Sequence, residues 1–274
     1  MKNIEEATNI IKNAMGNPYL TNCFLYYRDV LNMIGSRDIH VLSFEKMVIL
    51  VHEIDGIQKM YYFLESEESE IADIEKEIHM KLSVYPRLEA EFVAKSSCGQ
   101  SDVLEKLGFR FFKKYIRKKM VVSADFVCKE TDEVEIANES DLSSIYQLLY
   151  NTFDIMSDHL VSLRELRELL AMAQVLKVDI DGNLAGVLLF ETQGKKSYLR
   201  ALCVAEEFWG RRVGISLMQN YIKRNVCNTK MFYLWVESTN QGAKRLYEKL
   251  GYEDDGLRNY IYLYDACQHG KGIL

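Results

Sequence analysis

The chain has 274 residues, of which 48% are hydrophobic, so it is long enough for one large domain or two of ordinary size. Its net charge of −6 argues against general nucleic-acid binding, and the sequence has no run of about 18 apolar residues that predicts a membrane span. The polar start of the chain and six cysteines without CxxC spacing predict a reduced, cytoplasmic protein. Neither the cysteines nor the five histidines are spaced as metal ligands, so we expect no metal.

The first half of the chain alternates between helical and strand periodicity. The predicted helices cover residues 4–14, 20–34, about 66–81 and 101–107. The predicted strands cover 39–45, 46–54, 57–64, 87–94 and 109–120. Seven carboxylates and one lysine fall between residues 65 and 77, a composition that would repel a diphosphate. The basic run at 110–119 is interpreted as a solvated strand face, the alternative being a surface for nucleic acid or an acidic partner.

The second half shows the same alternation. Its predicted helices cover 140–153, 162–174, about 212–226 and 240–250, and its predicted strands cover 133–137, 175–181, 184–192, 197–204, 231–237 and 252–264. Asp181, Gly182 and Asn183 predict a hairpin turn between two of these strands. Periodicity is lost near 121–132, which predicts two domains, 1–121 and 133–274.

A short repeat links the two halves. Residues 105–108 are identical to residues 248–251, and Phe109 corresponds to Tyr252. Each copy follows an apolar strand and precedes an aromatic-rich one, which favours a duplicated domain, the alternative being an unrelated α/β domain. At the same offset, Leu104 corresponds to Tyr247 and Ile71 to Gly214.

The stretch FWGRRVGISLM at 208–218 follows a predicted strand and begins a helix. The first amides of a helix have no intrahelical partner and carry partial positive charge, so they can bind phosphate. Gly210 and Gly214 let the backbone approach a ligand closely, and Arg211 and Arg212 add positive charge. The alternative is a glycine-containing helix start with solvated arginines.

This stretch resembles the acetyl-CoA-binding motif of the GCN5-related N-acetyltransferase (GNAT) family, which reads Gln/Arg-x-x-Gly-x-Gly/Ala. An ungapped register places Trp209, Arg212 and Gly214 at the motif positions, and a shifted register uses Arg211, Gly214 and Ser216. The resemblance implies an α/β (α+β) fold, in which two tandem GNAT-like domains each have a mostly antiparallel mixed sheet flanked by helices. It also implies that the N-terminal copy is degenerate and lacks the CoA motif.

The resemblance further implies acetyl-CoA as cosubstrate. The implied donor contacts come from the strand end, the turn and the start of the last helix: Leu202, Cys203, Val204, Trp209, Gly210, Arg211, Arg212, Val213, Gly214, Ile215, Ser216 and Asn240.

The catalytic residues are also implied by resemblance. LYEKLGY at 246–252 is similar to the family pattern whose tyrosine protonates the CoA thiolate, which implies that Tyr247 is the general acid; a core tyrosine is the alternative. Asn240 is expected to cap its helix as well. Some family members carry a glutamate five residues before this asparagine, where this chain has Trp235. Glu237 points to the same sheet face and is the candidate base through water, or else a solvated strand-end carboxylate.

The predicted function is transfer of an acetyl group from acetyl-CoA to a primary amine, on a small molecule or a peptide, by direct attack. A longer acyl-CoA and a non-catalytic CoA-sensing or interaction module remain alternatives, as does a covalent acyl group on Cys203. Residues 121–274 carry 17 basic and 22 acidic side chains, which favours a cationic acceptor. The N-terminal half is expected to bind no CoA and to shape the acceptor site or a homodimer.

Overall fold

The computed structural model describes residues 4–34, 36, 38–54, 56–67, 71, 74–96, 101–122, 133–154, 157, 158 and 160–266. The chain divides into two compact units, one of residues 1–115 with 256–274 and one of residues 116–255. The domains expected from sequence, 1–121 and 133–274, differ from these units mainly at the C-terminus. There, residues 257–265 pair with a strand of the N-terminal unit. Segment 123–132, where the boundary is predicted, lies outside the described residues.

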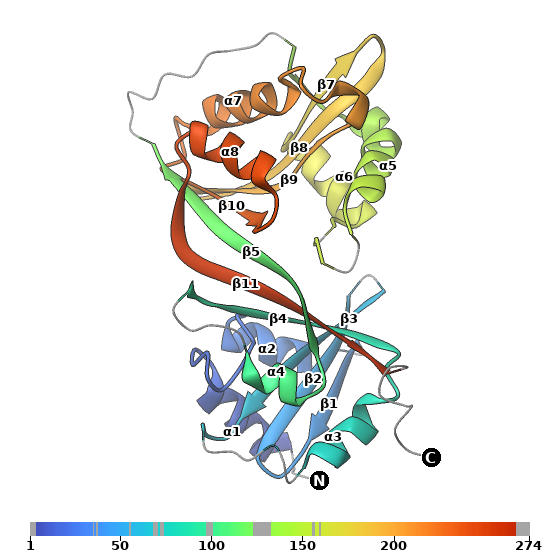
Figure 1. The fold of residues 1–274 in the computed structure, drawn as a ribbon, viewed down its shortest axis with the longest axis vertical. Helices are drawn as coiled ribbons and strands as arrows, with labels where there is room; N and C mark the ends of the chain where they lie inside the picture. The colour runs from blue at the N-terminus through green and yellow to red at the C-terminus, as the bar shows by residue number, and fades with distance from the viewer. Residues whose placement is uncertain are drawn as a thin grey trace. The chain divides into compact units, whose positions relative to one another are not determined.

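The N-terminal unit is a mixed sheet with helices (Figure 1). Its helices are α1 (Ile4–Ala14), α2 (Tyr27–Ile34), α3 (Glu75–Leu82) and α4 (Asp102–Lys106). Its strands are β1 (Ile39–Ser43), β2 (Met47–Ile54), β3 (Ile57–Leu64), β4 (Arg87–Lys95), the first part of β5 (Arg110–Val121) and most of β11 (Glu253–Asp265). The strand order is β1-β2-β3-β4-β11-β5.

Two predicted helices of this unit begin later than expected. The helix predicted over 20–34 begins at Tyr27, because Leu20, Thr21 and Asn22 are hydrogen-bonded to β3 instead. The helix predicted from about residue 66 begins at Glu75, after most of the acidic residues of segment 65–77. Residues 68–70, 72 and 73 of the predicted helix lie outside the described residues, while residues 66, 67, 71 and 74 are described and are not helical. Repulsion between like charges three and four residues apart disfavours a helix at these described positions.

The C-terminal unit follows the predicted order of elements closely. Its helices are α5 (Leu142–Thr152), α6 (Leu163–Ala171), α7 (Val213–Asn225) and α8 (Gln241–Lys249), with short 3₁₀ turns at Glu139–Asp141 and Glu206–Phe208. Its strands are β6 (Glu135–Ile136), β7 (Val175–Ile180), β8 (Asn183–Gln193), β9 (Lys196–Val204), β10 (Met231–Glu237) and residues 116–121 of β5. The strand order is β5-β10-β9-β8-β7-β6.

Two cores lie on the two faces of the C-terminal sheet. Residues of α7 and α8 pack with Phe232, Leu234 and Val236 of β10 in one cluster. Residues of α5 and α6 pack with Val187 and Cys203 in another. The predicted α/β class, a mixed sheet flanked by helices, is therefore confirmed (Figure 1). The hairpin predicted at 181–183 is confirmed too, since Ile180 pairs with Asn183 and both turn residues have positive φ.

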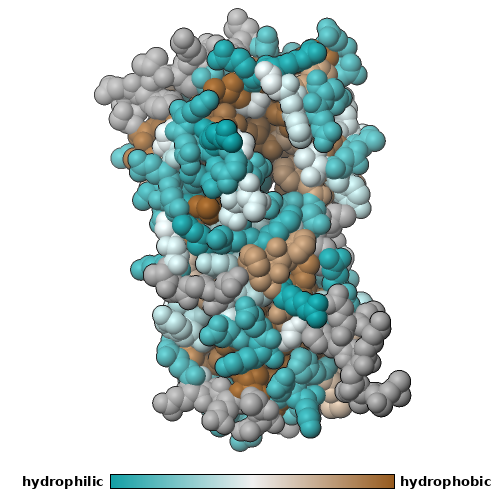
Figure 2. Space-filling view, in the orientation of Figure 1, coloured by the Kyte–Doolittle hydropathy of each residue, from teal (hydrophilic) through white to brown (hydrophobic). Residues whose placement is uncertain are grey.

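The surface and composition of the described residues add little by themselves. The face shown in Figure 2 is mostly hydrophilic, with smaller hydrophobic areas. Among the described residues no helix is long and apolar enough to cross a membrane, and no cluster of histidine, cysteine and acidic side chains is arranged to hold a metal. Cys23, Cys203 and Cys227 are free thiols. The other three cysteines, at 98, 128 and 267, lie outside the described residues.

Candidate functional site

The parallel strands β9 and β10 pair only at their beginnings. Their register runs from Lys196–Met231 to Tyr198–Tyr233 and ends there. On its other side β9 has a bulge: Leu199 pairs with Phe190 and Ala201 with Leu189, so Arg200 is the extra residue. A bulge bends a strand and increases its twist. Beyond it, residues 199–204 of β9 and 234–237 of β10 are not paired with each other, and we call this region the C-terminal split.

The ladder with β8 fixes which backbone groups of β9 face the split. Val204 pairs with Gly186, and the N–H of Ala205 donates to the carbonyl of Ala185. In an antiparallel ladder this makes Val204 and, two residues earlier, Leu202 members of non-hydrogen-bonded pairs. Their N–H and C=O groups therefore point away from β8, toward the split. Cys203 lies between them in a hydrogen-bonded pair, so its backbone groups point toward β8.

The turn that follows β9 has an unusual backbone. Gly210 has φ 79° and Arg212 has φ 67°, a left-handed conformation that costs an ordinary residue about 1–2 kcal/mol. Arg212 is the N-cap of α7, and its side chain makes no cap hydrogen bond. Among the described residues, the first amides of α7 have no side-chain acceptor. Arg212, which the ungapped register places at the first motif glycine, has positive φ, and Gly214, which the shifted register places there, does not.

Trp209 and Arg211 rest on the protein rather than extending freely into solvent. The indole Nε1 of Trp209 donates to the carbonyl of Val204 at 2.8 Å, although the side chain is 65% exposed. The guanidinium of Arg211 lies 5.4 Å from the ring centroid of Phe208. These contacts hold the turn against the end of β9, so the strand edge and the uncapped helix start form one continuous surface.

Gly186 of β8 is a site residue that the sequence reasoning missed. A Cβ at this position would lie 2.8 Å from Val213 Cγ1, 3.0 Å from the carbonyl oxygen of Cys203 and 3.2 Å from Leu217 Cδ1. Gly186 therefore lets the start of α7 pack closely against the sheet. The available signal was a glycine in the interior of an apolar strand, which often marks a close approach of another element.

Helix α8 carries the other two predicted residues. Asn240 is its N-cap, as predicted, with the side chain accepting from the N–H of Ala243 at 3.0 Å. Tyr247 is buried in the core shared by α7, α8 and β10, with its ring 5.9 Å from that of Tyr252. Burial raises the pKa of the Tyr247 phenol, so the hydroxyl stays protonated at neutral pH.

The face of β10 opposite α7 and α8 carries Tyr233, Trp235 and Glu237, since side chains alternate along a strand. Glu237 is half-buried, and its Oε1 accepts from the hydroxyl of Thr239 at 2.5 Å. Trp235 is 38% exposed. As predicted, Glu237 and Trp235 therefore share one sheet face. Glu206 and Glu207 are exposed in the turn after β9.

The basic run on β5 is less solvated than expected. Arg117 Nε lies 2.7 Å from Asp255 Oδ2, and Lys118 Nζ lies 2.9 Å from Glu248 Oε1. The side chain of Lys118 is only 6% exposed. The expectation of a solvated strand face is wrong at these two positions, because β5 is an interior strand of the sheet and brings them beside acidic partners.

Cys203 has the surroundings of a packing residue. Its side chain is buried with residues of α5 and α6, and its Sγ donates to Thr152 Oγ1 at 3.1 Å. Burial raises the pKa of the thiol, which lowers the fraction of reactive thiolate. These features disfavour the covalent alternative.

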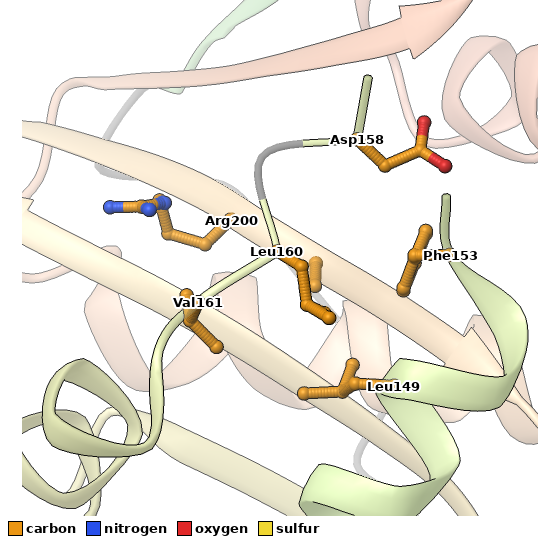
Figure 3. A pocket seen from close by; sticks show the side chains of 7 residues that line it. Leu149, Phe153, Asp158, Leu160, Val161 and Arg200 are labelled. Carbon is orange, nitrogen blue, oxygen red and sulfur yellow. The ribbon is translucent and has the colours of Figure 1, made fainter. Parts of the chain in front are cut away.

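A small hollow lies on the same side of the sheet as α5, next to the bulge. Leu149, Phe153, Leu160 and Val161 line it, together with Asp158, Arg200 and Ala201. Figure 3 shows the apolar side chains between α5 and the segment before α6, with the Asp158 carboxylate above Phe153 and the Arg200 guanidinium extending away from them. The guanidinium of Arg200 forms an ion pair with Glu191. The walls of the hollow are thus mainly apolar.

The N-terminal unit has a comparable pair of strands. The parallel pairing of β3 and β4 is limited to Lys59 and Glu89. In this N-terminal split, between residues 60–64 of β3 and 90–95 of β4, the chain inserts its own residues 20–23. Leu20 accepts from the N–H of Leu64 at 2.8 Å, and Thr21 forms an antiparallel bridge with Phe63.

Asn22 fastens this inserted segment to both strands. Its Nδ2 donates to the carbonyls of Met60 at 3.0 Å and Glu91 at 2.9 Å, and its Oδ1 accepts from the N–H of Tyr62 at 2.8 Å. The side chain is only 2% exposed. Among the described residues, the Leu202 backbone groups and the Val204 N–H face the C-terminal split without a strand partner, and the Val204 carbonyl accepts from Trp209. In the N-terminal split the chain itself occupies the facing backbone groups.

Comparison with known proteins identifies the fold and a family. The model of the acetyltransferase (GNAT) family matches residues 142–252. A tandem GNAT protein from the clavulanic acid biosynthesis pathway, solved without AcCoA, superposes with a TM-score of 0.59 at 12% identity, covering 96% of each chain. A GCN5-related N-acetyltransferase from Sphaerobacter thermophilus gives 0.55 at 15% identity, covering 89% of this chain and 86% of that one. A comparison with curated proteins gives no match.

A third structure, a GCN5-related N-acetyltransferase from Kribbella flavida, gives a TM-score of 0.54 at 13% identity and covers 93% of this chain and 95% of that one. At these identities the likeness shows the fold alone. It confirms the tandem GNAT arrangement, and it leaves the reaction and the substrates to be inferred from the residues of the site.

Proposed function

We propose, from the match of residues 142–252 to the acetyltransferase (GNAT) family, that the C-terminal unit transfers an acetyl group from acetyl-CoA to a primary amine. One observation carries the proposal. An uncapped helix start with a left-handed N-cap lies beside a strand edge whose N–H and C=O groups face an unpaired split. Such a surface suits a ligand with a diphosphate at one end and an amide-containing arm at the other.

In this proposal the amides of Val213, Gly214 and Ile215 bind the pyrophosphate, and Arg211 and Arg212 add charge to the same surface. Leu202 offers its N–H and C=O to the pantetheine arm, and Val204 offers its N–H, because the Val204 carbonyl already accepts from Trp209. The predicted backbone contact of Cys203 is not carried forward, because its N–H and C=O point toward β8. Trp209 holds the turn to Val204, and Asn240 positions the start of α8.

The amine nitrogen attacks the thioester carbonyl carbon directly, and the carbon–sulfur bond breaks to release thiolate. Tyr247 gives its hydroxyl proton to the sulfur, and the proton that the attacking nitrogen loses as the amide forms restores the phenol. An amine is mostly protonated at pH 7, so it must first lose a proton, and Glu237 accepts it through water. The raised pKa of Tyr247 keeps the proton in place but makes the phenol a weaker acid. We therefore expect its contribution at the lower end of the range for general acids, about a hundredfold.

The test has a binding part and a turnover part. Calorimetry with acetyl-CoA is expected to give one site per chain, and incubation with a panel of primary amines is expected to release free CoA with formation of an amide. Absence of acetyl-CoA binding at millimolar concentration would reject the proposal. Binding without turnover of any amine would instead favour a CoA-sensing module.

A further inference from the structure

The acceptor side of the proposed reaction has a defined surface. Side chains of β10 alternate, so Tyr233 and Trp235 lie on the sheet face away from α7 and α8. Tyr198 of β9 stacks on Tyr233 with ring centroids 5.3 Å apart and planes 19° apart. Trp235 belongs to the part of β10 beyond the paired residues. The rings thus run from the paired end of the two strands into the C-terminal split.

Arg117 of β5 completes this stack of rings. Its guanidinium lies 5.1 Å from the ring centroid of Tyr233 and 5.9 Å from that of Trp235. Its Nε also lies 2.7 Å from Asp255 Oδ2. A guanidinium held in this way by an ion pair and two rings presents a plane rather than a mobile charge. We call Tyr198, Tyr233, Trp235 and Arg117 the aromatic plate.

Two cations beside the plate, Arg117 and Arg200, are matched by carboxylates. The carboxylate of Asp255, with its side chain 4% exposed, balances Arg117, and Glu191 balances Arg200 at the bulge. A polyamine needs several carboxylates to replace the water around its charges. Of those beside the plate, Asp255 and Glu191 already have cationic partners, and in the proposed reaction Glu237 accepts the proton of the reacting amine. The plate instead offers apolar ring surface, and the hollow beside the bulge adds the apolar side chains of Leu149 and Phe153.

Trp235 is the part of the plate that a ligand can reach. It is 38% exposed, while the neighbouring strand residues Leu234 and Val236 are buried. A large exposed indole fixed beside a guanidinium favours ligands with a flat π-surface, because stacked aromatic pairs gain about 0.5–1.5 kcal/mol beyond the area they bury.

We propose that the acceptor is a primary amine carried by a flat aromatic group, which stacks on Trp235 of the aromatic plate and places its nitrogen at the split. This inference rests on the proposed function and narrows its substrate class. It replaces the cationic acceptor expected from overall charge, since the amine itself is then the only charge that the acceptor needs.

The chain offers a direct test because it contains only two tryptophans, at 209 and 235. In a Trp209→Phe variant, Trp235 is the single indole reporter of the acceptor face. With CoA present to fill the donor site without turnover, the variant is titrated with 2-phenylethylamine, 2-cyclohexylethylamine and spermidine. The first two amines differ in the flatness of their rings but hardly in size or charge. The ratio of their dissociation constants therefore isolates the contribution of stacking.

We expect 2-phenylethylamine to change Trp235 emission and to bind about three- to tenfold more tightly than 2-cyclohexylethylamine. Equal or tighter binding of the cyclohexyl amine or of spermidine overturns the inference, as does the absence of any response to the aromatic amine at millimolar concentration. In wild-type protein, calorimetry with the same amines checks that the Trp209→Phe change has not altered the ranking.

Two further variants separate this inference from the proposed function. In Trp235→Phe, Trp209 alone reports on the donor turn, so a response to CoA there tests the donor site without any acceptor. In Trp235→Leu, we expect the aromatic and cyclohexyl amines to show equal KM values in the CoA-release assay, with the KM for acetyl-CoA unchanged. Tyr26→Ala removes another exposed aromatic side chain, 82% exposed in the N-terminal unit, and is the matched control. An equal loss for both amines, or no loss for either, contradicts the inference.

Discussion

The two units of this protein contain the same feature, a parallel strand pair whose ladder stops early, but they use it differently. In the C-terminal split the freed edge of β9 faces no strand and adjoins an uncapped helix start. In the N-terminal split the corresponding groups of β3 and β4 hydrogen-bond to residues 20–22 of the same chain. An unpaired backbone group is costly when buried, so a fold that keeps the split must fill it with a ligand, with water or with itself.

The largest expected effect comes from placing a carboxylate at the start of α7, beside the C-terminal split. Gly214→Asp sets a negative charge among the amides proposed to bind phosphate, so we expect acetyl-CoA binding to be lost. The thermal stabilisation by acetyl-CoA, about 2.7 kcal/mol at 100 times the dissociation constant, should vanish with it. Differential scanning fluorimetry and calorimetry measure both.

Gly214→Ala is the matched control for this change. A Cβ at Gly214 would lie 3.6 Å from Val204 Cγ2 and 3.7 Å from Leu246 Cδ2, which is ordinary contact, so the alanine variant should still bind. The same experiment tests the claim that the N-terminal split binds no ligand. If Gly214→Asp still binds one acetyl-CoA per chain, the ligand is in the N-terminal unit, and the proposed difference between the two splits is wrong.

The second prediction concerns the N-terminal split, which the chain fills with its own residues. Asn22→Leu keeps roughly the same size but leaves the carbonyls of Met60 and Glu91 and the N–H of Tyr62 without their partner. Stranding three buried groups should lower the free energy of unfolding by about 2–5 kcal/mol. Urea denaturation followed by circular dichroism measures the loss.

Asn13→Leu, on the exposed face of α1, is the control and should change stability by less than about 0.5 kcal/mol. We also expect Asn22→Leu to gain no acetyl-CoA site, because the N-terminal unit has Ile71 where the repeat would place Gly214. A change for Asn22→Leu no larger than for the control would mean that these hydrogen bonds do not hold the split closed.

The third prediction tests whether the C-terminal split supports catalysis of acetyl transfer. Tyr247→Phe should lower kcat by about a hundredfold, or about 2.7 kcal/mol in the barrier, with little change in acetyl-CoA affinity. The phenol matters as charge develops on sulfur, and phenylalanine keeps the packing. Free-CoA release under saturating substrates measures the effect.

Tyr252→Phe is the control in the same core. The hydroxyl of Tyr252 is buried and has no hydrogen-bond partner among the described residues, so its removal should leave kcat unchanged and stability equal or slightly higher. Retention of more than half of the activity by Tyr247→Phe would assign Tyr247 to packing alone.

The sequence predicted the order of elements well because most of them follow strong local rules. The cap at Asn240, the turn at 181–183 and the strand before the phosphate-type turn each depend on a few neighbouring residues. The sequence also predicted that the first half lacks counterparts of Tyr247 and Gly214, because the repeat of residues 248–251 at 105–108 fixes which positions correspond. The aromatic plate was not readable, since it joins β5, β9 and β10 through a strand order that no local pattern encodes.

The filling of the N-terminal split was also hidden. Residues 20–34 show helical periodicity as a whole, yet Thr21 and Asn22 hydrogen-bond to strands about 40 and 70 residues further along the chain. Tertiary hydrogen bonds override local propensity there. The pairing of residues 257–265 with β4 of the N-terminal unit was hidden for the same reason. Strand pairing over long sequence separations leaves no short-range signal.

The smallest expected effect concerns Arg212, the residue with a left-handed backbone beside the C-terminal split. Arg212 has φ 67°, a conformation that glycine adopts without steric cost, and the ungapped motif has glycine at this position. Arg212→Gly should therefore relieve about 1 kcal/mol of strain, partly offset by the greater freedom of glycine in the unfolded chain. We expect a melting temperature equal to or a few degrees above that of the wild type.

Arg211→Gly separates strain from charge. Arg211 is not among the positive-φ residues, and its guanidinium packs on the Phe208 ring, so its removal loses the same charge and a favourable contact without relieving strain. We expect Arg211→Gly to be less stable than Arg212→Gly by about 1 kcal/mol, measured by urea denaturation in the absence of CoA. If the two variants are equally stable, the left-handed Arg212 is not strained. The loss of a motif glycine would then carry no cost to the fold, and its consequence would be confined to how closely a pyrophosphate approaches the start of α7.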